Sequence, residues 1–306
     1  MRNIFLTLSI LFCFLSSNCF ANEFGNIYNE AWKISKENFY DSTMNHQNWD
    51  RWQKHYANKI ESQDDLKVAI DSMLSSLDDY YTRYLLKSDF NEEHSDIHDN
   101  LSSISTKPPY FSTRIPKDIK YIRFISMMNK NLTKEVGDFI TESEKNTQVK
   151  GYIIDLRDNG GGLVKNASDI ASLFMNDKIV LYAKTNSRNI KNTTKPDQCI
   201  TTKPVVILIN GNTASACEVL TGAMQDNKRA YVIGTTSFGK GVIQQIKKLS
   251  DGSGIHVTVM AYYTPEFKEI NKKGIIPDEE LFFTRKDIFF HKDIQLLKSI
   301  EYLKRL

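Results

Sequence analysis

Apolar positions follow a helical spacing in the first third of the chain. Over residues 24–87 they recur every three or four residues, as in amphipathic helices. Ser62 is followed three residues later by Asp65, an arrangement typical of a helix start. The pattern predicts a small helical N-terminal domain over residues 22–90.

Strands and helices alternate from residue 119 onwards. Apolar runs predict strands at 119–125, 151–156, 179–183, 205–209, 230–233, 242–248 and 255–263. Helical spacing predicts helices at 131–144, 164–175 and 214–225. The glycine-rich stretch Ser250–Gly254 predicts a hairpin turn between the last two strands. This alternation is typical of an α/β core, here residues 119–284, and an amphipathic helix within residues 285–306 closes the chain.

Residues 91–118 are polar and include Pro108 and Pro109, so they are predicted to form a linker or exposed loop. His94 and His98 stand four positions apart in this stretch with Asp96 between them. A metal site there is conceivable, but no third strong ligand is near in sequence. Solvated histidines are therefore the favoured interpretation.

Residues 1–21 carry the pattern of a secretory signal. Arg2 precedes an apolar stretch, Ile4 to Leu15, and small and polar residues follow up to Ala21, the expected cleavage point. An uncleaved membrane anchor is the alternative, although the stretch is short for a span of ~20 residues. No later segment is apolar enough to cross a bilayer, so the mature protein is expected to be periplasmic or secreted.

The overall composition is that of an ordinary globular protein. The 306 residues are 41% hydrophobic and 25% charged, and the net charge of +3 without a dense basic stripe argues against a nucleic-acid partner. Cys199 and Cys217 remain after the signal segment. Export would permit a disulfide between them, whereas a buried Cys217 that behaves as a small apolar residue is the simpler interpretation.

Ser215 is the first candidate for chemistry, because it follows the apolar strand 205–209 and begins a predicted helix. Free backbone N–H groups at a helix start favour a negatively charged oxygen, as in a tetrahedral intermediate. Ser215 could therefore be a nucleophile. The alternative is that Ser215 or Thr213 only caps the helix.

Lys240 is the second candidate, in the glycine-flanked sequence Phe238-Gly239-Lys240-Gly241. A lysine in water titrates near 10.4, and only burial makes such an amine a useful base at neutral pH. Phe238 and Val242 are apolar neighbours that would make a partly buried site plausible, as would Ile243. A turn lysine exposed to water is the alternative.

Gly160-Gly161-Gly162 lies between a buried strand and a helix. The cluster matches neither a dinucleotide fingerprint nor a P-loop. A glycine turn could present a backbone N–H to a reacting carbonyl, although a helix-start turn without chemistry is the favoured interpretation of the glycines alone.

Taken together, these segments resemble the carboxyl-terminal processing, or tail-specific, peptidase family. The resemblance covers most of residues 24–306, and it is carried by Leu77–Leu85, Ile153–Gly162, Asn210–Asp226, Phe238–Gln244, Tyr262–Pro265 and Gly274–Asp278. It implies a crotonase-like mixed α/β core and an endopeptidase that hydrolyses polypeptides without a metal or organic cofactor.

The resemblance also implies residue roles. Ser215 maps to the nucleophile, Lys240 to the general base and Gln244 to the glutamine that orients the lysine. The backbone N–H groups of Gly161 and Ala216 map to the oxyanion hole. Gly160 departs from the family, which usually has Pro or Ser there.

One larger departure concerns substrate recognition. Family members usually carry a PDZ domain of ~90 residues, which binds a peptide terminus by strand addition, before the catalytic core. Here only residues 91–118 occupy that place, and they hold no carboxylate-binding loop. The PDZ domain is expected to be absent, so tail recognition is in doubt, and an adaptor protein could replace it.

Two other functions remain open. Relatives of the family without a PDZ domain include retinoid-binding modules, so the chain could be an inactive relative that binds a ligand or a protein. The retention of Ser215, Lys240 and Gln244 argues against that hypothesis. A secreted effector or inhibitor that engages a partner through its helical N-terminal part is a third possibility, to which no motif points.

Overall fold

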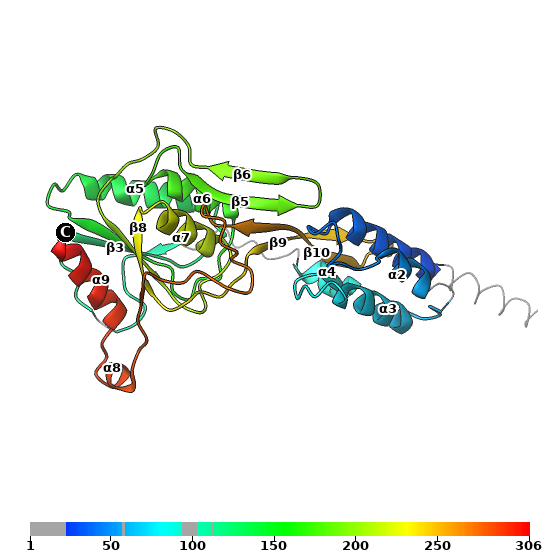
Figure 1. The fold of residues 1–306 in the computed structure, drawn as a ribbon. Helices are drawn as coiled ribbons and strands as arrows, with labels where there is room; N and C mark the ends of the chain where they lie inside the picture. The colour runs from blue at the N-terminus through cyan, green and yellow to red at the C-terminus, as the bar shows by residue number, and fades with distance from the viewer. Residues whose placement is uncertain (1–22, 57–58, 94–102, 112) are drawn as a thin grey trace, which may run out of the picture. The chain divides into compact units, whose positions relative to one another are not determined.

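The structure is a computed structural model that describes residues 23–56, 59–93, 103–111 and 113–306. The chain divides into two compact units (Figure 1). Of the described residues, the first unit holds 23–56, 59–93, 184–188 and 243–261, and the second holds 103–111, 113–183, 189–242 and 262–306. The expected signal segment, residues 1–21, lies outside the described residues.

Helices dominate the first unit. They are a helix whose described part is residues 23–38, α2 (Asp50–His55), α3 (Gln63–Ser75) and α4 (Lys87–Glu93). Ser62 caps α3 and accepts a hydrogen bond from the Asp65 N–H, which confirms the predicted helix start. The unit also holds β1 (Arg83–Leu85) and most of β9 (Val242–Lys248) and β10 (Gly254–Tyr263).

The apolar face of α3 provides the centre of this unit's core. Leu66, Ile70 and Met73 are fully buried, and they belong to one cluster with Ile255 and Val257 of β10. The helical spacing in the sequence therefore identified the buried face correctly.

A six-stranded sheet in the order β11-β8-β7-β4-β3-β2 organises the second unit. Its strands are β2 (Ile104–Ser105), β3 (Ile119–Phe124), β4 (Gly151–Asp155), β7 (Val205–Ile209), β8 (Ala230–Gly234) and β11 (Glu279–Glu280). The strands from β3 to β11 pair in parallel, whereas β2 is antiparallel to β3. Every residue of β4 and β7 is buried, as expected for central parallel strands covered on both faces.

Helices cover both faces of this sheet (Figure 1). One face carries α9 (Ile294–Arg305), whose Leu296, Ile300 and Leu303 share a buried cluster with β4 and β7. The other carries α5 (Leu132–Glu144), α6 (Val164–Ser172) and α7 (Ala216–Asp226). The carboxyl ends of β4 and β7 lead into the loops that contain Gly161 and Ser215, and the carboxyl end of β8 leads into the loop that contains Lys240.

The expected α/β fold with its helical N-terminal region is confirmed, and most predicted elements are present. The structure adds elements that lack an apolar signal: β6 (Asn189–Thr193) in a polar stretch after β5 (Ile179–Thr185), and α8 (Arg285–Phe289) before α9. The expected linker 91–118 contributes β2 to the core sheet. Among the described residues, no helix has both the length and the apolar character needed to span a bilayer.

Candidate active site

Ser215 lies at a sharp turn between β7 and α7. Its backbone has φ 58° and ψ −121°, a conformation that is unfavourable for a residue with a side chain. The surrounding loop fixes this geometry, because Ala214 N–H donates to the Asn159 carbonyl at 3.0 Å and Phe238 N–H donates to the Thr213 carbonyl at 2.9 Å. Strain of this kind is concentrated at functional sites, including serine nucleophiles on strand-to-helix turns.

Gly161 packs directly against this turn. It has φ +98°, and a Cβ atom there would lie 2.6 Å from the Ala214 carbonyl oxygen and 2.9 Å from the Ala216 nitrogen. Only glycine allows the two loops to approach so closely. The Gly161 N–H donates to Asn159 Oδ1 at 2.9 Å, so this amide already has an acceptor in the structure.

Ala216 begins α7, and its backbone nitrogen is therefore at the positive end of the helix dipole. The next amides of the first turn have acceptors within the turn. Cys217 N–H donates to the Ala214 carbonyl, and the Glu218 and Val219 N–H groups donate to the Ser215 carbonyl. The start of α7 thus offers a favourable environment for a negatively charged oxygen beside Ser215.

Glu218 is a fully buried carboxylate in the first turn of α7. Its Oε2 accepts the backbone N–H groups of Ser215 and Lys240, each at 2.8 Å. Its Oε1 accepts the Gly239 N–H at 2.7 Å and the Ser237 hydroxyl at 2.6 Å. Burial raises the pKa of Glu218 above its usual 4.5, and these hydrogen bonds oppose the rise.

The Lys240 loop depends on its two glycines. A Cβ atom on Gly241 would lie 2.3 Å from the Asn271 nitrogen, and Gly239 has φ +89°. The Lys240 carbonyl accepts the Tyr262 hydroxyl at 2.7 Å. Lys240 itself is half-buried, while Val242 is buried and Phe238 is 57% exposed, so Phe238 does not provide the expected apolar cover.

Gln244 belongs to the first unit, in the part of β9 that this unit contains. Its side-chain amide donates to Thr258 Oγ1 at 3.3 Å, an interaction within that unit. The structure therefore brings together the loops of Gly161, Ser215, Ala216 and Lys240, all in the second unit. The orienting role of Gln244 stays a prediction.

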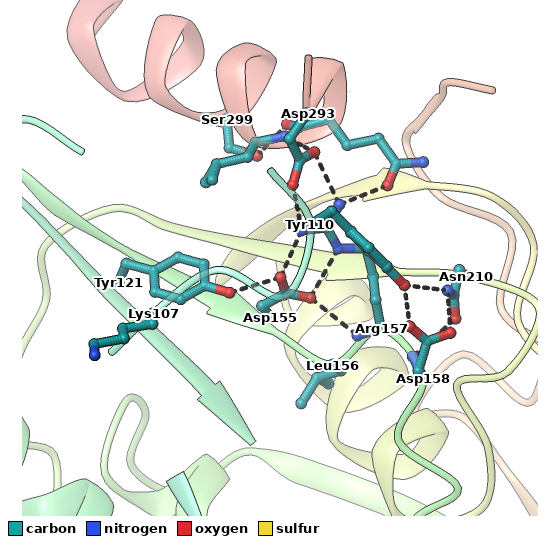
Figure 2. Close-up of polar contacts among 12 residues, drawn as sticks. Lys107, Tyr110, Tyr121, Asp155, Leu156, Arg157, Asp158, Asn210, Asp293 and Ser299 are labelled. Atoms are coloured by element: carbon teal, nitrogen blue, oxygen red, sulfur yellow. Dashed lines mark hydrogen bonds and ion pairs between the residues drawn. The ribbon is translucent and has the colours of Figure 1, made fainter. Parts of the chain in front are cut away.

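A buried ion-pair network lies at the end of β4 (Figure 2). The Arg157 guanidinium is fully buried and makes paired hydrogen bonds to Asp155 and to Asp293, the N-cap of α9, at 2.6 to 2.9 Å. Asp155 also accepts the Tyr121 hydroxyl at 2.8 Å. Two carboxylates around one guanidinium satisfy the buried charges and tie β4 to α9.

Asp158 forms a second polar cluster in the same loop (Figure 2). Its Oδ1 accepts the side-chain amides of Asn210, at 2.8 Å, and Asn212, at 3.0 Å, and its Oδ2 accepts the Tyr110 hydroxyl. Sequence reasoning missed Asp158, Tyr110 and Glu218 as parts of the site. Asp158 and Glu218 lie close in sequence to the glycine and serine motifs, and that proximity is the only signal that could have indicated them. Tyr110 has no such signal.

The sequence also raised the questions of a metal site and of a disulfide. Among the residues that the structure describes, no group of three or more His, Cys, Asp or Glu side chains is arranged to hold a metal ion. His94 and His98 lie outside the described residues. Cys199 and Cys217 are free cysteines, and Cys217 is fully buried, as the simpler interpretation of that residue expects.

Comparison with known proteins identifies the family. Residues 118–281 match Peptidase family S41, and residues 20–74 match the Tricorn protease C1 domain. A carboxyl-terminal-processing protease of Synechocystis sp. is 28% identical over 82% of this chain and 79% of its own length. Carboxyl-terminal-processing peptidase 2 of Arabidopsis thaliana, a chloroplastic protein, is 38% identical over 56% of this chain and 33% of its own length.

A solved structure has the same fold. The photosystem II D1 C-terminal processing protease superposes with a TM-score of 0.71 at 23% identity, over 84% of this chain and 93% of that one. The S41 match spans the whole stretch that contains Gly161, Ser215, Glu218 and Lys240. The chain therefore belongs to peptidase family S41, among the carboxyl-terminal processing peptidases.

Proposed function

We propose that the protein is an exported serine endopeptidase that hydrolyses polypeptides through a Ser215–Lys240 dyad. The observation that carries the proposal is the pair of hydrogen bonds from the Ser215 and Lys240 amides to Glu218 Oε2. One buried carboxylate thereby joins the backbone of the strained serine turn to that of the glycine-flanked lysine loop. Such an arrangement suits a nucleophile and its base, which must keep a fixed geometry.

The proposed reaction has two stages. Neutral Lys240 Nζ takes the Ser215 hydroxyl proton while Oγ bonds to the scissile carbonyl carbon. The tetrahedral intermediate then expels the amine, which takes that proton from Lys240. Water next attacks the acyl-enzyme ester, gives its proton to Lys240 and releases the acid as the proton returns to Ser215.

The oxyanion is proposed to accept hydrogen bonds from the Ala216 and Gly161 N–H groups. Ala216 has the simpler role, at the first turn of α7. The Gly161 amide donates to Asn159 Oδ1 in the structure, so it would have to turn from that acceptor towards the substrate. Gln244 is proposed to orient Lys240. No cofactor takes part in this sequence of steps.

A direct test uses Ser215→Ala and Lys240→Met in the full chain. Wild-type protein should cleave a denatured protein and should react at Ser215 with a fluorophosphonate probe, whereas both variants should lose both activities. Cleavage that persists in Ser215→Ala would refute the assignment. A wild-type protein that binds the probe at no pH, including alkaline pH, would favour the ligand-binding alternative.

Export is proposed from residues 1–21 and tested separately. Expression in a bacterial host should yield a periplasmic or secreted protein whose first residue follows Ala21. An intact N-terminus on a membrane-bound product would instead support the anchor alternative.

A further inference from the structure

The segment 103–111 lies where the sequence predicts a linker, yet the structure makes it part of the second unit. Its strand β2 pairs with β3, with Ile104 opposite Phe124 and Ser105 opposite Arg123. The chain then continues to Tyr110, which stands over the carboxyl end of β4 (Figure 2). This segment therefore reaches the loops of the proposed site, although it is remote from them in sequence.

Tyr110 makes two kinds of contact there. Its ring covers the buried ion-pair network, with the Arg157 guanidinium carbon 4.7 Å from the ring centroid. Its hydroxyl donates to Asp158 Oδ2 and accepts the Asn210 side-chain amide at 3.4 Å. Burial and the neighbouring Asp158 raise the pKa of Tyr110 above its usual value, so the phenol keeps its proton at neutral pH and can donate to Asp158.

Asp158 also forms hydrogen bonds with the loop that precedes Ser215. Besides accepting the amides of Asn210 and Asn212, Asp158 donates its own N–H to Asn210 Oδ1 at 3.0 Å. Asn210 Oδ1 also accepts the Asn212 N–H at 3.1 Å. Asp158 has φ 58°, so its own turn needs outside contacts to hold its conformation.

We propose that Tyr110 is a positioning residue, whose hydroxyl holds the Asp158 turn and, through Asn210 and Asn212, the loop that carries Ser215. Tyr110 does not act on the substrate. It lowers the mobility of the nucleophile loop and thereby raises the rate of acylation. The inference rests on the proposed Ser215 chemistry for its kinetic part, whereas its structural part, the order of residues 209–216, is independent of that chemistry.

The test compares Tyr110→Phe with wild type in the full chain. This change removes the hydroxyl and keeps the ring over Arg157. Tyr80→Phe is the matched control, because Tyr80 is 87% exposed and the chemical change is identical. Hydrogen exchange of a peptide covering residues 209–216, followed by mass spectrometry, reports on the loop without any activity.

We expect amides in residues 209–216 to exchange about tenfold faster in Tyr110→Phe, because one hydrogen bond to a carboxylate is lost. The acylation rate of Ser215 by the fluorophosphonate probe and kcat on a peptide should fall by about tenfold, with KM unchanged. In an Asp158→Ala background the same change should add little, because the acceptor is already absent. Tyr80→Phe should behave as wild type.

Loop exchange in Tyr110→Phe equal to that of wild type would overturn the inference. So would faster exchange together with wild-type acylation, or a rise in KM alone, which would indicate a substrate contact. If wild type itself never reacts with the probe, the proposed function fails, and the exchange result still decides whether Tyr110 holds the loop.

Discussion

The backbone amides of Ser215 and Lys240 share one acceptor, Glu218 Oε2, at 2.8 Å each. Lys240 lies 22 positions after Glu218 in the sequence. The serine turn and the lysine loop are thereby joined at a single buried atom. The nucleophile and base segments of the proposed dyad therefore depend on a third residue that takes no proton in the reaction.

Glu218→Gln should disrupt both loops. Each carboxylate oxygen of Glu218 now accepts two hydrogen bonds. The NH₂ group that replaces one oxygen in glutamine is a donor, so it cannot accept the two hydrogen bonds made to that oxygen. We expect the unfolding free energy to fall by about 2–4 kcal/mol and Ser215 labelling to be lost. Urea denaturation and probe labelling measure the two effects.

The matched control is Glu142→Gln, at a side chain that is 74% exposed and paired with Lys145. It should change stability by less than about 1 kcal/mol. Equal stability loss in the two variants would show that the Glu218 network does not hold the site.

Gly161→Ala and Gly160→Ala form a second matched pair. A Cβ atom at Gly161 meets the Ala214 carbonyl at 2.6 Å and requires φ +98°, whereas one at Gly160 meets nothing within 4 Å. We expect Gly161→Ala to cost about 1–3 kcal/mol and to displace the Ser215 turn, with loss of probe labelling. Gly160→Ala should fold and label normally, and a reversed order of effects would contradict the loop packing.

Arg157→Lys should be strongly destabilising despite keeping the charge. An ammonium group cannot reproduce the paired hydrogen bonds to Asp155 and Asp293, so buried carboxylate oxygens lose their donors. The expected loss is about 3–5 kcal/mol in chemical denaturation. Arg305→Lys, at an exposed pair with Glu301, should cost less than about 1 kcal/mol. Similar losses of stability in Arg157→Lys and Arg305→Lys would show that the buried network around Arg157 contributes no more than an exposed ion pair.

Acid should reveal the contact between Tyr110 and Asp158. Burial raises the pKa of Asp158, but hydrogen bonds from Tyr110, Asn212 and Asn210 outweigh it and hold the pKa below the usual 3.8. A carboxyl whose pKa is lower in the folded state than in the unfolded state stabilises the fold at pH values above its unfolded-state pKa. That stabilisation is lost as the pH falls through the folded-state pKa. The stability gap between wild type and Tyr110→Phe should therefore be full at about pH 6 and shrink below about pH 4. A gap that widens in acid would have the wrong sign.

The sequence carried enough information for the main elements and for the motifs of the loops that hold Gly161, Ser215 and Lys240. Strands such as 205–209 are continuous apolar runs, and the structure buries every residue of them. The glycine motifs around Gly161 and Lys240 stand out in the sequence, and the structure places Gly161 and Gly241 in close contact with neighbouring backbone. These signals are local, so a single sequence reveals them.

The supporting contacts could not be predicted in the same way. Tyr110 bonds to a residue 48 positions away, and Arg157 to one 136 positions away, and no local pattern specifies such partners. Strand β6 was missed because its sequence is polar and its side chains are largely outside the core. Phe238 was expected to cover Lys240, but apolar character alone does not determine which way a loop side chain faces.

The ion pair between Arg157 and Asp293 makes the last helix a structural requirement of the proposed site. A chain shortened before Asp293 would leave the guanidinium with Asp155 alone and would uncover the sheet face under Leu296, Ile300 and Leu303. Loss of the carboxyl end would thus disrupt the proposed site by loosening β4 rather than by removing any proposed reacting group.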